Sequence, residues 1–292
     1  MKETLFENII GQDTAKLAIK DWYLHETQPL LIYGPSGYGK TNFAESLGAI
    51  TIDTTQFRGD RMNTILRPIK EAEDGDILFF DEIHSLQPKI LEGLYKIIDK
   101  GTFYDTELGI DLPIPNVRFI FATNIIAPLP TAFINRCRMV ELQDYTLDEL
   151  KQIIHNRYPE IDFEALESIV KAAKGVPRTA LSYAKSVIAG SKTDRVLEIN
   201  PAEVNRILTS RMDIDPDTGL NQKEFNIVQK VAERGHLSMS AVANILKTTV
   251  TDAKRQYIEP LRAAEWIAVS QSGVILGYKG HENYRKFIKR LK

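Results

Sequence analysis

A glycine-rich run that ends in a lysine and a threonine occupies residues 34–41 of the 292-residue chain. Its residues are Gly34, Pro35, Ser36, Gly37, Tyr38, Gly39, Lys40 and Thr41. Glycines let backbone N–H groups turn inward around phosphates, and a following helix N-terminus adds its positive dipole end. Lys40 would neutralise the β and γ phosphates, and Thr41 would place its hydroxyl on Mg²⁺. The run predicts a site for ATP and Mg²⁺.

Polar side chains follow two later apolar runs. Residues 77–80 lead to Asp81, which can hold magnesium through its water shell, and to Glu82, which can polarise the water that attacks the γ-phosphate. Residues 117–122 lead to Asn124, which can orient that water. Because parallel strands end at one edge of a sheet, these side chains should share a crevice with the glycine-rich run. We expect Glu82 and Asn124 to be catalytic, and Thr41 and Asp81 to hold the metal.

The bulk composition is that of an ordinary globular protein. Hydrophobic residues make up 43% and charged residues 26%, and the length suggests two or three domains. A lone cysteine, Cys137, cannot form an internal disulfide, and no uncharged apolar run approaches a membrane span. We therefore expect a cytoplasmic protein without a membrane segment. The net charge of −2 conceals a basic end, since residues 213–292 hold 13 Lys and Arg against 9 Asp and Glu.

The chain divides into segments of different character. Residues 1–143 alternate apolar strand-like runs with helical patterns, which predicts an α/β domain with a doubly wound parallel sheet. Residues 144–208 show only helical patterns, beginning with Thr146 as an N-cap and Glu149 three residues later. Residues 209–219 are polar and contain Pro216 and Gly219, as a linker does. Residues 220–292 combine three helical patterns with a hairpin, which predicts a winged helix.

The order and spacing of these residues resemble the AAA+ superfamily over almost the whole chain. The resemblance implies an AAA+ P-loop ATPase core followed by a small helical lid domain. In residues 6–12 it resembles the segment that frames adenine, and in residues 175–178 it resembles the lid motif. Tyr145, at the junction of core and lid, packs either on the base or as an ordinary hinge aromatic. The nucleotide-binding residues so implied, besides those of the glycine-rich run, are Ile9, Ile10, Tyr145, Pro177 and Arg178.

Two arginines fit the chemistry of phosphoryl transfer, because a positioned guanidinium stabilises charge that develops on the γ oxygens. The segment 135–137 resembles the finger motif of the superfamily, so Arg136 would act on a neighbouring subunit's nucleotide. Arg138 is its close competitor. Arg178 opens a lid helix and would act within its own subunit. For each arginine, the alternative role is a surface salt bridge.

Two segments are similar to the RuvB family of Holliday-junction branch-migration motors. They are residues 75–86 and the winged-helix segment 219–287. This resemblance implies an ATP-driven motor that moves double-stranded or junction DNA as a homo-oligomeric, hexameric ring, with a RuvA-like or other DNA-processing protein as a possible partner. The residues expected to contact DNA phosphates are Lys279, Arg285, Lys286, Lys289 and Arg290. The alternative reading of this basic end is a solvated helical face.

Two other functions fit parts of the sequence. A clamp-loader or helicase-loader type AAA+ switch, acting on a protein partner at DNA, is favoured by Asn124 and by the segment 135–137. A non-enzymatic DNA binder that uses nucleotide only for assembly is disfavoured by the intact Glu82.

Overall fold

The computed structural model describes residues 5–54, 62–105, 110–194 and 198–283. The chain divides into two compact units, Met1–Asp144 and Tyr145–Lys292. Within the described residues, no helix combines the length and the apolar character that crossing a membrane would require.

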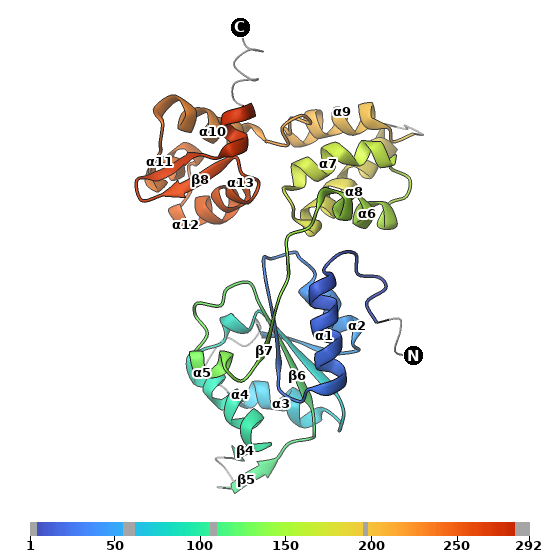
Figure 1. Cartoon of the computed structure of the whole chain (residues 1–292), viewed down its shortest axis with the longest axis vertical. Coiled ribbons are helices and arrows are strands. Elements are labelled where there is room, and N and C mark those ends of the chain that lie inside the picture. The colour runs from blue at the N-terminus through green and yellow to red at the C-terminus, as the bar shows by residue number, and fades with distance from the viewer. Residues whose placement is uncertain (1–4, 55–61, 106–109, 195–197, 284–292) are drawn as a thin grey trace. The chain divides into compact units, whose positions relative to one another are not determined.

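The N-terminal unit is a five-stranded parallel sheet with helices on both faces (Figure 1). The strand order is β2-β3-β6-β1-β7. The strands are β1 Leu30–Tyr33, β2 Ile50–Asp53, β3 Ile77–Asp81, β6 Arg118–Thr123 and β7 Arg138–Glu141. The sequence forms such a sheet because its strands are apolar runs, and both faces of a parallel sheet are covered.

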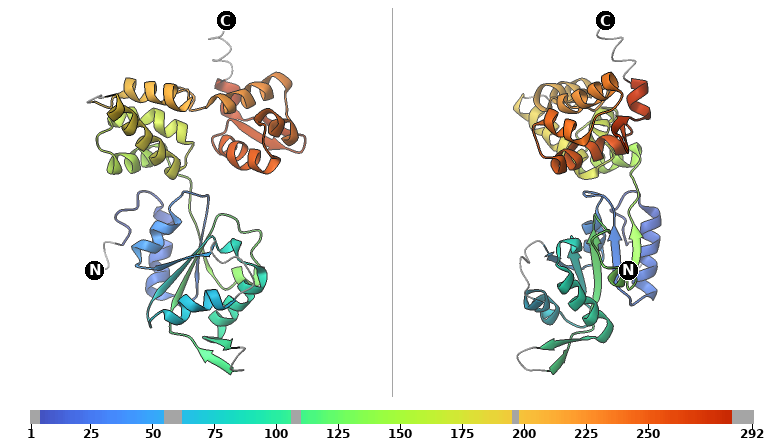
Figure 2. Two further views of the ribbon diagram at one scale, coloured as in Figure 1. Left: turned by 180° about the vertical axis from the view of Figure 1, so that it is seen from behind. Right: turned by 90° about the vertical axis from the view of Figure 1, so that its left-hand side faces the viewer.

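Helices of the N-terminal unit lie in two layers (Figure 2). One layer holds α1 Asp13–His25 and α2 Lys40–Ser46, and the other holds α3 Met62–Glu71, α4 Pro88–Lys100 and α5 Thr131–Ile134. Phe80 and Phe121 of the sheet pack with Ile69 of α3 and Leu94 of α4 in one buried cluster. The chain leaves β1 in one direction along the sheet and leaves β3 and β6 in the other. This reversal creates the crevice at which open α/β sheets bind ligands.

A short antiparallel hairpin interrupts the path from α4 back to the sheet. It consists of β4 Thr102–Asp105 and β5 Ile110–Pro113. Gly101 caps α4 in a left-handed conformation, with φ of 63°, and so turns the chain into this hairpin.

The C-terminal unit begins with a bundle of four helices and a short turn. They are α6 Leu147–Arg157, η3 Phe163–Ala165, α7 Leu166–Ala173, α8 Pro177–Thr193 and α9 Pro201–Met212. Thr146 and Glu149 form the expected reciprocal cap at the start of α6. Helix α9 runs to Met212, although the sequence predicted a linker from residue 209. Its last turn is still helical, and Met212 packs there against the buried cluster that includes Ile207 and Leu208.

The same unit ends in a winged helix. Its elements are α10 Gln222–Arg234, α11 Met239–Leu246, α12 Val250–Ala253, the π turn η4 Lys254–Ile258, α13 Glu259–Ala263, β8 Ile267–Ser270 and β9 Gly273–Leu276. The π turn ends two residues before Pro260, which has no N–H to donate to the preceding turn. Leu237 pairs with Val274 and so joins the hairpin to the helices. The structure confirms the expected fold: an α/β core, a helical domain and a winged helix.

Candidate functional site

The glycine-rich run forms the loop between β1 and α2. Gly37 and Gly39 adopt φ of 85° and 93°, which side chains rarely accept, so glycine is needed where the loop turns into the helix. The Lys40 side chain lies inside this loop, with Nζ donating to the carbonyl oxygens of Gly34 at 2.8 Å and Pro35 at 3.0 Å. The residue is only 6% exposed. The loop therefore holds a buried positive charge where phosphates would enter.

Thr41 and Asp81 lie together, although 40 residues separate them. The Thr41 hydroxyl is 3.4 Å from Asp81 Oδ2, and Asp81 Oδ1 accepts the Glu82 N–H at 2.9 Å. Mg²⁺ is usually bound through one or two protein oxygens, phosphates and several waters. A hydroxyl beside one carboxylate fits that donor set. In the described parts of the chain, no cluster of three or more His, Cys, Asp and Glu offers an all-protein metal site, so the phosphates would have to complete the shell.

Glu82 is held in an uncommon backbone conformation at the end of β3, with φ of 51°. Its Oε2 is buried and makes no hydrogen bond among the described residues, although Nδ1 of His84 lies 3.2 Å away. A buried carboxylate oxygen without a donor is poised to accept a proton or a water hydrogen. The role of Glu82 as a general base stays a prediction.

Two threonines from the neighbouring strands hold the turn that carries Glu82. Thr54 follows β2, and its hydroxyl lies 2.5 Å from the Asp81 carbonyl oxygen and 3.0 Å from that of Glu82. Thr123 ends β6, donates to the Ile125 carbonyl at 2.7 Å and lies 3.0 Å from His84 Nδ1. Because the Thr123 proton is used, His84 must donate from Nδ1. The sequence did not predict these threonine contacts; polar residues at the ends of strands were the only indication of them.

Asn124 follows Thr123 directly and is exposed. Thr123 pairs in register with Tyr33, and its carbonyl accepts the Gly34 N–H at 3.3 Å. Asn124 therefore lies at the same edge of the sheet as the phosphate loop. The structure brings the loop together with Asp81 and Glu82, and Asn124 follows at the same edge of the sheet; the roles of these residues at a nucleotide stay predictions.

The N-terminal segment packs beside this loop. Ile9 is buried, Ile10 is half-buried, and the ring of Phe6 meets Phe43 of α2 at a centroid distance of 5.2 Å. The Gln12 side chain fixes this segment to Gln143, which follows β7. Its Nε2 donates to the Gln143 carbonyl at 2.6 Å, and its Oε1 accepts the Gln143 N–H at 2.8 Å. The sequence did not predict this pair of hydrogen bonds.

Tyr38 is buried at the tip of the phosphate loop. Its hydroxyl donates to Asp144 Oδ1 at 2.9 Å, so the loop is tied to the last residue of the N-terminal unit. The aromatic residue in the glycine-rich run therefore has a structural partner of its own.

The arginines near β7 lie at the opposite end of the strands. Arg138 begins β7 in register with Leu30, the first residue of β1, whereas the phosphate loop starts after Tyr33. Three strand residues separate these levels by roughly 10 Å. Arg138 lies 3.8 Å from Glu26, and Arg136 is held by Asp99 and Tyr95 of α4. Neither arginine is placed to serve the nucleotide of its own subunit.

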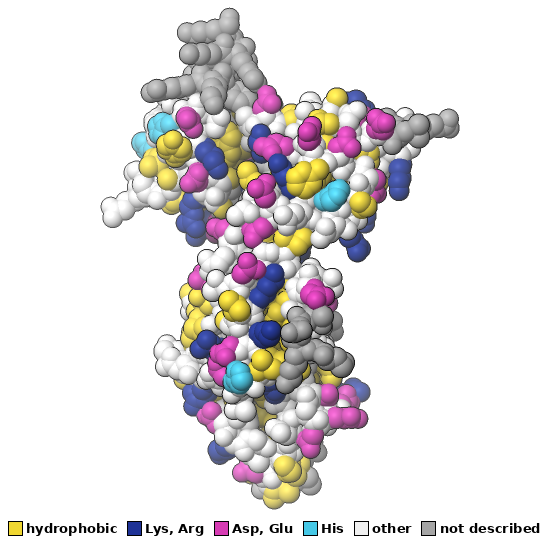
Figure 3. All heavy atoms as spheres, turned by 45° about the vertical axis from the view of Figure 1, so that its right-hand side comes forward, with side chains coloured by type: hydrophobic (Ala, Val, Ile, Leu, Met, Phe, Trp, Pro, Cys, Tyr) yellow, Lys and Arg dark blue, Asp and Glu magenta, His cyan; other side chains and the backbone are white. Residues whose placement is uncertain are grey.

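The remaining predicted residues lie in the C-terminal unit. Tyr145 packs against the helical core, Pro177 is buried at the first position of α8, and Arg178 is exposed one residue later. Lys279 Nζ lies 3.4 Å from Glu265 Oε2. Arg285, Lys286, Lys289 and Arg290 lie outside the described residues. On the face drawn in Figure 3, basic and acidic side chains are interspersed.

Comparison with known proteins finds RuvB subunits among the relatives of this chain. Residues 30–145 match the ATPase family associated with various cellular activities (AAA). The RuvB subunit of the Holliday junction branch migration complex of Lactobacillus helveticus is 27% identical over 70% of this chain and 62% of its own length. That of Mesomycoplasma hyopneumoniae is 24% identical over 97% of this chain and 96% of its own. The solved RuvB branch migration motor of Thermotoga maritima is 26% identical, with a TM-score of 0.77 over 97% of this chain and 98% of its own.

Proposed function

We propose, from the premise that this chain is a RuvB-like ATPase of the AAA type, that it hydrolyses ATP to drive branch migration of Holliday junctions. The observation that carries the proposal is the presence in one chain of the phosphate loop, with Asp81 and Glu82 beside it, and a winged helix, in a fold that matches nearly the full length of the solved RuvB.

The chain binds nucleotide together with a divalent metal, and we take the metal to be Mg²⁺. In the proposed reaction Lys40 binds the terminal phosphates, while the Thr41 hydroxyl would ligate the metal and Asp81 would hold it through its water shell. Glu82 accepts a proton from the attacking water, with Asn124 orienting that water. The bound Mg²⁺ would neutralise charge that develops on the leaving phosphate.

The adenine and lid contacts are part of the same proposal. Ile9 and Ile10 would pack on the base. Tyr145 is already packed on the helical core, which supports its role as a hinge aromatic more than as a base contact. Pro177 starts α8 and presents Arg178, whose guanidinium would reach the γ-phosphate within the same subunit.

Assembly into a ring follows from the place of Arg136. A guanidinium at the opposite end of β7 from its own phosphate loop would contribute to hydrolysis only at a neighbour's nucleotide. Subunits joined in this head-to-tail way form a ring where the rotation between neighbours closes. We propose a hexamer that surrounds duplex DNA.

DNA contact would come from the winged helix. Lys279 would have to leave Glu265 to reach a phosphate, and the basic residues that follow it would supply further contacts. Such contacts fix position and salt dependence without reading sequence. A RuvA-like protein that holds the junction is the proposed partner. The loader alternative is not favoured, because the relatives named above are RuvB proteins and match this chain over most of its length.

A synthetic four-way junction tests the proposal. With ATP, Mg²⁺ and a RuvA-like protein, we expect the junction to be converted into duplex products, and we expect DNA to stimulate ATP hydrolysis. The Lys40→Ala variant is the control for contaminating activity. Slow turnover that a protein partner stimulates, without any junction movement, would instead identify a loader.

A further inference from the structure

A buried ion pair joins the helical bundle to the winged helix. Lys174 caps α7 in a left-handed conformation, with φ of 52°, and its Nζ lies 3.0 Å from Glu224 Oε2 in α10. The side chains of Lys174 and Glu224 are only 7% and 5% exposed. Burying two charges is unfavourable unless the geometry satisfies both, so such a pair specifies one arrangement of its elements.

Both side chains also form hydrogen bonds with nearby backbone groups. Lys174 Nζ donates to the carbonyl oxygens of Gly219 at 3.0 Å and Ala172 at 3.2 Å. Glu224 Oε2 accepts the Asn221 N–H at 2.9 Å, and the Asn221 side chain accepts the Glu224 N–H at 3.0 Å. The carboxylate therefore closes the first turn of α10 and faces the end of α7 at once.

The connecting segment is not a loose tether. Gly219 has φ of 69°, and a Cβ there would lie 2.6 Å from the carbonyl carbon and oxygen of Lys171 in α7. Its N–H donates to the Asp215 carbonyl at 2.7 Å, and the Asp215 N–H donates to the Leu220 carbonyl at 2.9 Å. Residues 213–221 thus form a closed loop whose backbone rests on the last turn of α7.

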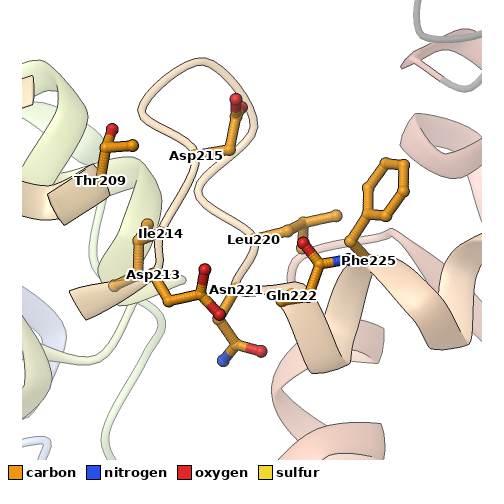
Figure 4. Close-up of a pocket in the computed structure, with 8 residues that line it drawn as sticks. All are labelled: Thr209, Asp213, Ile214, Asp215, Leu220, Asn221, Gln222 and Phe225. Atoms are coloured by element: carbon orange, nitrogen blue, oxygen red, sulfur yellow. The ribbon is translucent and has the colours of Figure 1, made fainter. Parts of the chain in front are cut away.

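A pocket of about 240 Å³ lies where this loop meets the end of α9 and the start of α10, and Figure 4 draws the residues that line it. Asp213 and Ile214 line it from the end of α9, and Asn221 and Phe225 line it from α10. Residues of the 213–221 loop line part of this pocket. The charged connection between bundle and winged helix lies at α7, through Lys174.

Lys174 stands one residue before the lid motif of residues 175–178, which carries Arg178. We propose that Lys174 and Glu224 form a coupling joint: they hold the winged helix to the bundle, so that movement of the bundle on ATP hydrolysis also moves the DNA-binding elements. Both are positioning residues in this role. The inference rests on the proposed motor function, because it assigns the route by which that motor's ATP cycle reaches DNA.

Glu224→Gln tests the joint, since glutamine at this position can still close the helix cap but carries no charge. We expect DNA-stimulated ATP turnover to stay within twofold of wild type, and junction movement per ATP consumed to fall at least tenfold. Glu233→Gln, at an exposed position of the same helix, is the matched control. Unchanged junction movement per ATP in Glu224→Gln would overturn the proposal.

Lys174 supplies a second pair of variants. Lys174→Arg keeps the charge and should retain at least half of the junction movement per ATP, whereas Lys174→Gln should lose it as Glu224→Gln does. A merely structural role predicts no such rescue in the ratio of movement to ATP. Equal ratios in the two lysine variants would contradict the joint.

A measurement on the wild-type chain avoids any folding defect of the variants. Amide hydrogen exchange of residues 213–224 should change between the ATP-bound and nucleotide-free protein, because the joint would transmit the nucleotide state. No change there, with clear protection of the phosphate loop, would overturn the joint while leaving the ATPase intact. Failure of the wild type to bind ATP or move junctions would refute the proposed function instead.

Discussion

The guanidinium of Arg136 forms a salt bridge with the carboxylate of Asp99, with Nε 2.8 and 2.9 Å from its two oxygens and Nη2 2.7 Å from Oδ2. Nη1 donates to the Ala132 carbonyl at 2.6 Å, and the group lies 4.9 Å from the centre of the Tyr95 ring. Hydrogen bonds from Arg136 hold the pKa of Asp99 below its usual value. Asp99 stands three residues before the β4–β5 hairpin, so the position of the finger candidate depends on the end of α4.

Replacing Arg136 should remove hydrolysis without removing nucleotide binding. In Arg136→Ala, no guanidinium reaches the neighbour's γ-phosphate, so steady-state ATP turnover should fall by roughly 10³-fold. ATP affinity, measured with a fluorescent nucleotide, should change by less than about threefold. Mixing this variant with Glu82→Gln subunits should restore some turnover, because some mixed interfaces then contain both an intact base and an intact arginine.

Arg138→Ala is the matched control, since Arg138 lies two residues away and contacts only Glu26 at 3.8 Å among its described ion pairs. It should hydrolyse ATP at close to the wild-type rate. If instead Arg136→Ala is active and Arg138→Ala is not, the finger assignment passes to Arg138.

Replacing the proposed base should trap ATP. Glu82→Gln keeps the size of the side chain but cannot accept a proton from water, so single-turnover hydrolysis should slow by roughly 10²–10⁴-fold. ATP should remain bound for the whole measurement, as a filter assay with labelled nucleotide would show. Glu92→Gln, on the exposed side of α4, should behave as wild type. Rapid hydrolysis by Glu82→Gln would assign the base to another group.

Loss of the loop lysine should abolish stabilisation by nucleotide. Wild-type protein at an ATP concentration 100 times its Kd gains about 2.7 kcal/mol by mass action, which a thermal shift would detect. Lys40→Ala loses the charge that faces the phosphates and should show no shift. Lys96→Ala, an exposed lysine of α4, should keep the full shift. A normal shift in Lys40→Ala would mean that phosphates bind elsewhere.

The sequence was sufficient for the parts of the site that are contiguous or fixed by strand order. Residues 34–41 are adjacent in the chain, and Thr41 meets Asp81 because parallel strands end together. The apolar runs predicted the fold class, because both faces of a parallel sheet are covered and its strands are therefore apolar. The winged helix followed from three helical patterns and a hairpin.

Contacts between distant helices could not be predicted in this way. The partner of Arg136 lies 37 residues away in α4, and the partner of Lys174 lies 50 residues away across a segment whose polar composition indicated a simple linker. Such pairs depend on how helices pack, and charge patterns alone allow many pairings. His84 was similarly hidden, because only the folded turn places it between Glu82 and Thr123.

An ion-pair network in the helical bundle makes its stability depend on acid pH. Arg206 donates to Glu203 and Asp194, and Arg211 also donates to Asp194. Hydrogen bonds from Arg206 are the main cause that lowers the pKa of Glu203 and of Asp194. The ordinary pKa values are 4.5 and 3.8, so both carboxylates are ionised and fully contribute above about pH 4.5.

Because the folded pKa values lie below the unfolded ones, this contribution is lost as pH falls from about 4.5 through the folded values. Arg206→Leu removes the shared donor. Its thermal unfolding midpoint at pH 7, followed by circular dichroism, should lie below that of the wild type by roughly 2–4 °C. The difference should shrink on acidification to pH 3, because protonated carboxyls no longer need the arginine. Arg157→Leu, an exposed position on α6, should show no such pH-dependent difference. A deficit in Arg206→Leu that stays constant from pH 7 to pH 3 would mean that Arg206 stabilises the bundle by packing rather than through the two carboxylates.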